Sequence, residues 1–173
     1  QTKNRSLSKR QLRVSSMKNV TFVSALFDID RVDGRKWDQY LKWFDMTLKL
    51  RVPMLLFITE DLQEFVDERR GDLPTKTVHI TADEIPYYHL KEPIQEILDS
   101  DDYKNNISDP DRIECKQAMY SVIQYSKFPW LNHATKLNPF DSDVYFWLDA
   151  GGSRFFNNFD LSEEYPGVAA MES

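Results

Sequence analysis

An α/β fold with a largely parallel sheet is predicted by three observations on the sequence. Four short runs of apolar, β-branched and aromatic residues are near-continuous, which is typical of strands covered on both faces. The segments between the early runs have apolar residues at spacings of three and four, as in amphipathic helices. Strands and helices therefore alternate along the chain, and this alternation is typical of a parallel sheet. The length of 173 residues suits one domain.

The first half of the chain contains three of the predicted strands, which are expected over residues 20–27, 54–58 and 76–80. The helix between the first two is expected from Trp37, because its apolar residues as far as Leu48 share one face, and it is expected to stop near Pro53. The next helix is expected over residues 60–70. Thr59 is suited to cap its start, and Gly71 is suited to close its end.

The second half is more helical. A short helix is expected over residues 92–98, and a longer one starts at residues 109–111 and ends at Pro129. The residues of this longer helix that are expected to face inward are Ile113, Met119, Tyr120, Ile123 and Phe128 or its neighbours. Residues 130–137 form a further turn or two. The fourth strand is expected over residues 144–148 and ends at Asp149.

Charge is unevenly distributed along the chain. The 22 Lys and Arg residues and the 28 Asp and Glu residues give a net charge of −6. Residues 1–18 contain six basic residues and no acidic one, so the other 155 residues carry −12. We therefore expect a basic arm over residues 1–18 and one acidic domain over residues 19–173. Such a domain offers no broad surface for nucleic acid, which requires clustered Lys and Arg.

The sequence leaves the cellular compartment open. Its one cysteine, Cys115, cannot form an internal disulfide, which is compatible with the cytoplasm. No stretch approaches the ~20 consecutive apolar residues of a membrane-spanning helix, so no span is expected in this sequence. An anchor or signal upstream of Gln1 would instead place the domain in the lumen of the secretory pathway.

Acidic residues follow the first and the fourth predicted strand. In a parallel sheet, ligands bind at the carboxyl ends of the strands, where the loops converge. Asp28, Asp30 and Asp33 follow the first strand and are equally typical of an ordinary turn. Asp149 follows the fourth strand, and the small residues 150–152 leave room for a ligand. A carboxylate at such a place is suited to bind a divalent cation or a sugar hydroxyl.

Several segments resemble the HtrL/YibB family, whose members are treated as glycosyltransferases of the GT-A type. The most specific segment is Phe146-Trp147-Leu148-Asp149-Ala150-Gly151, and the others are residues 20–28, 53–59, 125–128 and 138–140. The resemblance implies a GT-A-like fold, with a Rossmann-type, mostly parallel sheet flanked by helices. It also implies transfer of a sugar from a nucleotide-sugar donor to a glycan or another hydroxyl acceptor. Residues 150–173 are few for the acceptor half of such a domain, which is then short or continues beyond this sequence.

The resemblance further implies a metal site. In GT-A enzymes an Asp-x-Asp motif after an apolar strand reaches the donor diphosphate through Mn²⁺ or Mg²⁺. Asp149 matches the first position of this motif and is the candidate metal ligand, whereas the third position is Gly151. Three alternatives follow. Another acid completes the site (Asp28, Asp30 or Asp141), or donor binding is independent of metal, or activity is lost.

Two basic residues are candidates for binding the donor diphosphate, together with Asp28 and Gly151 as further substrate contacts. A leaving nucleoside diphosphate carries two or three negative charges, which a cation must stabilise. Arg154 lies five residues past Asp149, and its guanidinium suits phosphate. Lys127 lies in a family-like segment and is equally explained as a charge near the C-terminal end of a helix. The sequence does not indicate a catalytic base.

Two other functions stay open at the level of sequence. A phosphatase of the haloacid dehalogenase type would use Asp28 as nucleophile and Asp30 as general acid, with Thr59 after the second strand. Against it, no second Asp closely follows Asp149. The other alternative is a glycosyltransferase-like domain that binds a ligand or partner without catalysis, which the missing second carboxylate favours.

Overall fold

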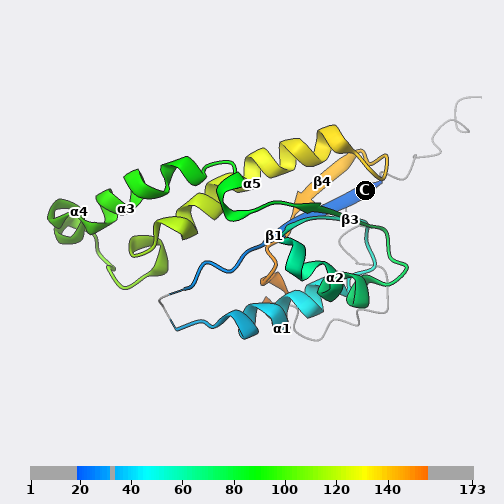
Figure 1. Ribbon diagram of the computed structural model, residues 1–173, viewed down its shortest axis with the longest axis horizontal. Coiled ribbons are helices and arrows are strands. Elements are labelled where there is room, and N and C mark those ends of the chain that lie inside the picture. Colours follow the sequence, from blue (N-terminus) through cyan, green and yellow to red (C-terminus); the bar gives the residue numbers. More distant parts are fainter. Residues whose placement is uncertain (1–18, 32–33, 156–173) are drawn as a thin grey trace, which may run out of the picture.

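The computed structural model describes residues 19–31 and 34–155, and it contains a four-stranded, all-parallel sheet (Figure 1). The strands are β1 (Val20–Leu26), β2 (Met54–Ile58), β3 (Thr75–His79) and β4 (Val144–Trp147), in the order β3-β2-β1-β4. The predicted α/β fold class is confirmed, and no strand boundary differs from its expected position by more than one residue. The basic arm predicted for residues 1–18, Asp33 and the last part of the predicted domain, residues 156–173, lie outside the described residues.

The two central strands are covered on both faces, as their near-continuous apolar sequences predict. Every residue of β1 and β2 is buried. Along β1, Phe22 and Leu26 contribute to one hydrophobic core, and Val23 and Ala25 contribute to the other. Helices α1 (Trp37–Leu48) and α2 (Gln63–Arg70) lie on one side of the sheet, and α5 (Ala118–Leu137) lies on the opposite side (Figure 1).

Helix α1 forms where the apolar spacing predicts it, and its residues Phe44 and Leu48 are completely buried against the sheet. Helix α2 begins later than expected, because the short 3-10 helix η1 (Glu60–Leu62) precedes it. The predicted capping role of Thr59 is wrong, since its hydroxyl makes no capping hydrogen bond to η1. Gly71 ends α2 with a φ of 49°, a conformation that favours glycine.

Helix α5 differs from the prediction in its start and its length. It begins at Ala118, after a loop that contains the 3-10 helix η4 (Ile113–Cys115), and it continues through Pro129 to Leu137. Proline lacks the backbone N–H of a helix interior, but it does not end α5. The physical reason is tertiary packing, because the residues of α5 at every fourth position are buried: Ala118, Val122, Ser126, Trp130 and Ala134.

Trp130 is the largest residue of this buried stripe. Its ring stacks with those of Phe57, Phe27 and Trp147 at centroid distances of 5.6, 5.6 and 5.8 Å. Phe128, which was expected to face inward, lies off the stripe and is 77% exposed. The burial of apolar surface along the stripe therefore outweighs the hydrogen bond that Pro129 cannot donate.

Between β3 and α5 the chain forms the 3-10 helices η2 (Ala82–Glu84) and η3 (Tyr88–Leu90) and two short helices. Helix α3 (Lys91–Asp99) matches the helix expected over residues 92–98, whereas α4 (Asp101–Asn106) was not predicted. Ser100 caps α4, because its hydroxyl accepts the N–H of Tyr103 at 3.2 Å. None of the helices in the described part of the chain is both long and apolar enough to span a membrane.

Candidate functional site

A cavity of about 130 Å³ opens at the carboxyl ends of β1 and β4. The loop after β1, the start of α1, the middle of α5 and the segment after β4 form its walls. β1 and β4 are neighbours in the sheet, although the chain forms β2 and β3 between them on the other side of β1. The direction of strand order therefore changes between β1 and β4. Open parallel sheets bind ligands at such a switch point.

The structure brings together the residues that the sequence predicted for donor or metal binding. They line the cavity, and they are Asp28, Lys127, Asp149, Gly151 and Arg154. Asp28 follows β1, Lys127 comes from α5, and the other three follow β4. Segments up to about 120 residues apart in sequence therefore meet at one place, as expected for the carboxyl edge of a parallel sheet.

Asp149 accepts hydrogen bonds from two neighbours in the cavity. Its Oδ1 lies 2.7 Å from Nζ of Lys127 and 2.7 Å from Nε1 of Trp147. Burial raises the pKa of Asp149, but the hydrogen bonds from Lys127 and Trp147 and the charges of Lys127 and Arg154 hold it below its ordinary value of 3.8. The carboxylate is therefore ionised at neutral pH and forms an ion pair with Lys127.

Gly151 permits a close approach between the segment after β4 and α1. A Cβ atom at this position would lie 3.2 Å from Cε3 of Trp43, tighter than most contacts of this kind. The same atom would lie 3.7 Å from Nη1 of Arg154 and 3.7 Å from the ring of Tyr40. The absence of a second Asp in the Asp-x-Asp pattern thus has a packing reason in this fold.

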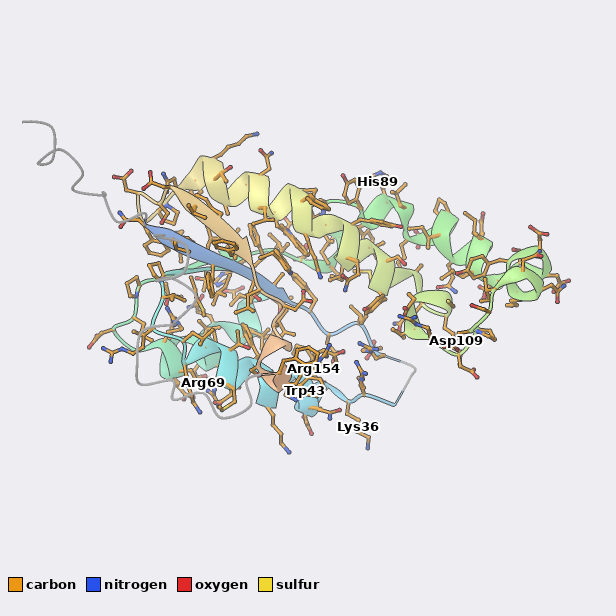
Figure 2. The ribbon with its side chains drawn as sticks, turned by 180° about the vertical axis from the view of Figure 1, so that it is seen from behind. Lys36, Trp43, Arg69, His89, Asp109 and Arg154 are labelled. Atoms are coloured by element: carbon orange, nitrogen blue, oxygen red, sulfur yellow. The ribbon has the colours of Figure 1, made fainter. Side chains whose placement is uncertain are left out.

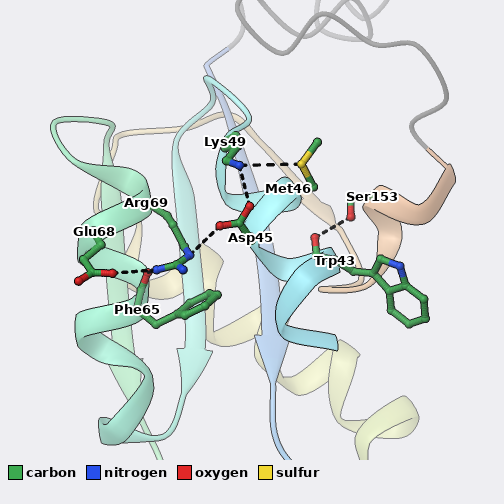
Figure 3. A network of polar contacts seen from close by, with 8 residues as sticks. All are labelled: Trp43, Asp45, Met46, Lys49, Phe65, Glu68, Arg69 and Ser153. Carbon is green, nitrogen blue, oxygen red and sulfur yellow. Dashed lines mark hydrogen bonds and ion pairs between the residues drawn. The ribbon is translucent and has the colours of Figure 1, made fainter. Parts of the chain in front are cut away.

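The segment after β4 is fixed to α1 by two hydrogen bonds. Thr47 donates its hydroxyl to the carbonyl of Ala150 at 2.9 Å, and Ser153 donates to the carbonyl of Trp43 at 2.6 Å (Figure 3). Ser153 lies in the 3-10 helix η5 (Gly152–Phe155), which also carries Arg154. The guanidinium of Arg154 lies over the Trp43 ring, 5.4 Å from its centroid, and the two side chains lie together in Figure 2.

Two further arginines in the cavity wall were missed by the sequence analysis. The guanidinium of Arg31 donates a hydrogen bond to the hydroxyl of Tyr40, and it lies 5.4 and 5.3 Å from the ring centroids of Tyr40 and Tyr120. Arg35 also lines the cavity. Both belong to an irregular loop without a motif. The one sequence feature that indicates these two arginines is their position after the first strand, at the same sheet edge as Asp28.

Aromatic rings form much of the remaining wall: Phe27, Trp37, Tyr40, Tyr120 and Trp147. Trp37 and Tyr40 lie on the apolar face of the helix predicted from residue 37, and both pack against the hydrophobic core while also facing the cavity. Burial is the main cause that raises the pKa of Tyr120, so this phenol is neutral at physiological pH. Flat apolar rings with polar tips are suited to contact a nucleobase or a sugar face.

The oxygen and nitrogen donors at the cavity do not fit a hard divalent cation. Among the described residues, no three His, Cys, Asp or Glu side chains lie close enough together to hold a metal ion. Asp141 precedes β4, at the opposite end of that strand from Asp149, and Asp30 is not part of the cavity wall. Asp28 lines the cavity, but its Oδ1 accepts the N–H of Asp30 at 2.9 Å.

The phosphatase alternative would need Asp30 and Thr59 to act beside Asp28. Of Asp28, Asp30 and Thr59, only Asp28 lines the cavity. The hydrogen bond from the backbone of Asp30 to Asp28, together with a φ of 50° at Asp30, describes a turn closed by a side chain. The geometry of Asp28 and Asp30 therefore supports the interpretation that they belong to an ordinary turn.

Positive charge predominates in the cavity wall. Among the residues that the structure describes, four cationic side chains (Arg31, Arg35, Lys127 and Arg154) and two carboxylates (Asp28 and Asp149) line the cavity, so their formal charges sum to about +2. The whole chain carries −6. The cavity is thus a cationic site on an acidic protein, and its chemistry is suited to an anionic ligand with an aromatic part.

The fold and the cavity define an α/β protein of Rossmann-like type with a cationic cavity at the switch point of its sheet. The sequence matches the family described as "Bacterial protein of unknown function (HtrL_YibB)" over residues 18–169. The chain therefore belongs to the HtrL/YibB family, which confirms the resemblance found in the sequence. No curated protein and no solved structure matches the chain.

Proposed function

We propose that this protein is a glycosyltransferase that binds a nucleotide-sugar donor in the cavity between β1 and β4. It transfers the sugar to a glycan or another hydroxyl acceptor. The observation that carries the proposal is the coincidence of three features at the switch point: excess positive charge, aromatic walls and an open carboxyl edge.

The two parts of the donor correspond to the two kinds of side chain in the wall. The diphosphate suits Lys127, Arg154 and Arg31, because charge-assisted hydrogen bonds to phosphate oxygens are strong. The nucleobase suits the aromatic part of the wall. When the bond between the sugar and the diphosphate breaks, negative charge grows on the diphosphate, and fixed cations lower the energy of that state.

The reaction also needs an acceptor. The oxygen of its hydroxyl group forms the new bond to the anomeric carbon as the nucleoside diphosphate leaves, and the hydroxyl proton passes to a base. Asp149 is ionised, but Lys127 and Trp147 already donate hydrogen bonds to it. We assign no catalytic base.

A melting screen against nucleotide sugars tests the donor part of the proposal. A ligand at about 100 times its Kd stabilises a protein by about 2.7 kcal/mol, which raises Tm by several degrees for a chain of this size. We expect such a shift for at least one nucleotide sugar, and we expect Arg154→Met to reduce it. Lys136→Met, which removes a lysine from an exposed position of α5 away from the cavity, is the matched control. No shift with any nucleotide or nucleotide sugar would contradict the proposal.

Catalysis is tested separately, by release of nucleoside diphosphate from the stabilising donor in the presence of glycan or other hydroxyl acceptors. A binding domain without catalysis would show the melting shift but no release with any acceptor. A phosphatase would instead hydrolyse an aryl phosphate, and Asp28→Asn would abolish that hydrolysis.

A further inference from the structure

We propose that the cavity binds the donor diphosphate without a divalent cation, and that Lys127 and Arg154 occupy the role that a metal ion has in an Asp-x-Asp site. This inference rests on the proposed function, because it concerns how the donor is held in the same cavity. It is argued from the side chains that contact Asp149, from the charge of the wall and from the packing around Gly151.

Asp149 is the residue that matches the metal-binding position of the motif. Its Oδ1 already accepts hydrogen bonds from Nζ of Lys127 and Nε1 of Trp147, each at 2.7 Å. The side chain of Lys127 is only 19% exposed, and its ammonium also lies 5.7 Å from the centroid of the Trp147 ring. A cation that bound the other oxygen of Asp149, Oδ2, would stand beside this ammonium, whose positive charge would repel it. Lys127 itself presents a positive charge where the metal would stand.

The net charge of the cavity wall also favours binding of a diphosphate without a metal ion. A nucleoside diphosphate with two or three negative charges meets a wall with a local charge of about +2, so the wall alone balances most of the ligand charge. Arg154 offers a planar fork of N–H donors, which suits phosphate oxygens and requires no metal to bridge them.

Gly151 stands where the motif would place its second carboxylate. A side chain here would start 3.2 Å from Trp43 and 3.7 Å from Nη1 of Arg154. An aspartate at this position would thus lie beside Arg154 and would neutralise it. The glycine keeps this guanidinium available for a ligand.

Calorimetric titration with inorganic pyrophosphate and with adenosine, guanosine and uridine diphosphates tests the inference, in buffer with EDTA and in buffer with MnCl₂. We expect at least one of these ligands to bind with EDTA, and MnCl₂ should not lower its Kd. Lys127→Met should weaken this binding by about tenfold or more, because it removes a charge-assisted hydrogen bond. Lys136→Met, the control on the same helix, should leave Kd unchanged.

Asp149→Asn separates the two mechanisms by the direction of its effect. If Lys127 and Arg154 bind the diphosphate, removal of the opposing negative charge should leave the affinity unchanged or raise it by up to about tenfold. If a metal on Asp149 binds the diphosphate, the same variant should lose binding. Asparagine keeps an oxygen that accepts from Trp147, so this variant tests charge with little change in shape.

The outcomes distinguish this inference from the proposed function. Binding that requires MnCl₂ and is lost in Asp149→Asn would overturn the metal-free site and leave a glycosyltransferase intact. Binding with EDTA that Lys127→Met and Arg154→Met do not weaken would also overturn the inference. Failure of all four ligands to bind in both buffers would overturn the inference and the proposed function together.

Discussion

At the scale of single residues, Arg70 shows how a charged side chain becomes part of the core. It is 2% exposed, and its guanidinium donates hydrogen bonds to the carbonyls of Leu48, Leu50, Val52 and Pro74 at 2.6–3.0 Å and to the hydroxyl of Thr75 at 2.7 Å. Burial lowers its pKa to about 10, so the side chain is still protonated at neutral pH. One side chain from the end of α2 thereby satisfies carbonyls from the end of α1 and from the loops before β2 and β3.

Arg70→Met should destabilise the protein by at least about 3 kcal/mol, because several buried carbonyls lose their donor at once. Arg69→Met is the matched control, since Arg69 is the neighbouring residue with a more exposed side chain, and it should cost about 1 kcal/mol or less. Urea unfolding followed by circular dichroism measures both. Equal costs for the two variants would show that the buried hydrogen bonds of Arg70 are not the source of its effect.

Sequence alone did not predict this role, because Arg70 looks like an ordinary basic residue in the last turn of a helix. The same limit applies to Arg31 and Arg35, whose loop has no periodicity or motif. Asp28 and Asp149 were found because a carboxylate directly after an apolar strand has a predictable position at the sheet edge. Residue roles are thus predictable where the backbone fixes the location, and they are hidden where side chains from separate loops have to meet.

At the scale of elements, an ionic network joins α1 to α2. Asp45 of α1 binds Nζ of Lys49 at 2.6 Å and Nε of Arg69 from α2 at 2.8 Å, and Arg69 also contacts Glu68 and the ring of Phe65 (Figure 3). The hydrogen bond from Lys49 is the largest cause that lowers the pKa of Asp45. Burial opposes it, and Arg69 adds to it. The network therefore stabilises the protein only while this carboxylate is ionised.

Asp45→Asn should cost about 0.5–1 kcal/mol at pH 7. Because the pKa of Asp45 is lower in the folded protein than its ordinary value of 3.8, its contribution is present above that value and is lost as pH falls through the lower folded value. The gap in unfolding free energy between the wild type and Asp45→Asn should therefore close as pH falls through this lowered folded pKa. A double-mutant cycle with Arg69→Met isolates the bond between the helices. A gap that persists in acid would contradict an ionic origin.

The helices also show where sequence patterns stop being sufficient. β1, β2 and α1 were predicted well, because their patterns are continuous and local. α5 was not, since Pro129 indicates an end that the packing of Val122, Trp130 and Ala134 against the sheet overrides. The start of α5 was misplaced for a related reason. Residues 109–111 have the composition of a helix start, but the chain forms a loop there.

At the scale of the whole molecule, the cavity joins the helix layers that lie on opposite sides of the sheet. Trp37 and Tyr40 come from α1 on one side of the sheet, and Tyr120 and Lys127 come from α5 on the other. A ligand in the cavity contacts both layers at once. Helices α3 and α4 contribute no residue to the wall, so a ligand in the cavity would not contact them directly.

Hydrogen exchange should therefore respond to a bound nucleoside diphosphate in a defined pattern. Amides of residues 25–29, 37–40, 120–127 and 149–154 should exchange at least about tenfold more slowly, because the ligand stabilises the closed state of the segments it contacts. Amides of α4, residues 101–106, should exchange at an unchanged rate and serve as the internal control. Uniform slowing along the chain would indicate general stabilisation without a ligand at this cavity.

The pairing of β1 with β4 also determines when the cavity forms. Val20 pairs with Val144, so the two strands at whose carboxyl ends the cavity opens are 124 residues apart in sequence at this pair. Closing so long a loop is entropically costly, and parallel pairings of this kind form late and slowly. A nascent chain that has been translated only as far as α5 already contains β1, β2 and β3, yet it has no cavity. If the cavity binds the proposed donor, β4 and η5 have to be in place before that ligand can assist folding.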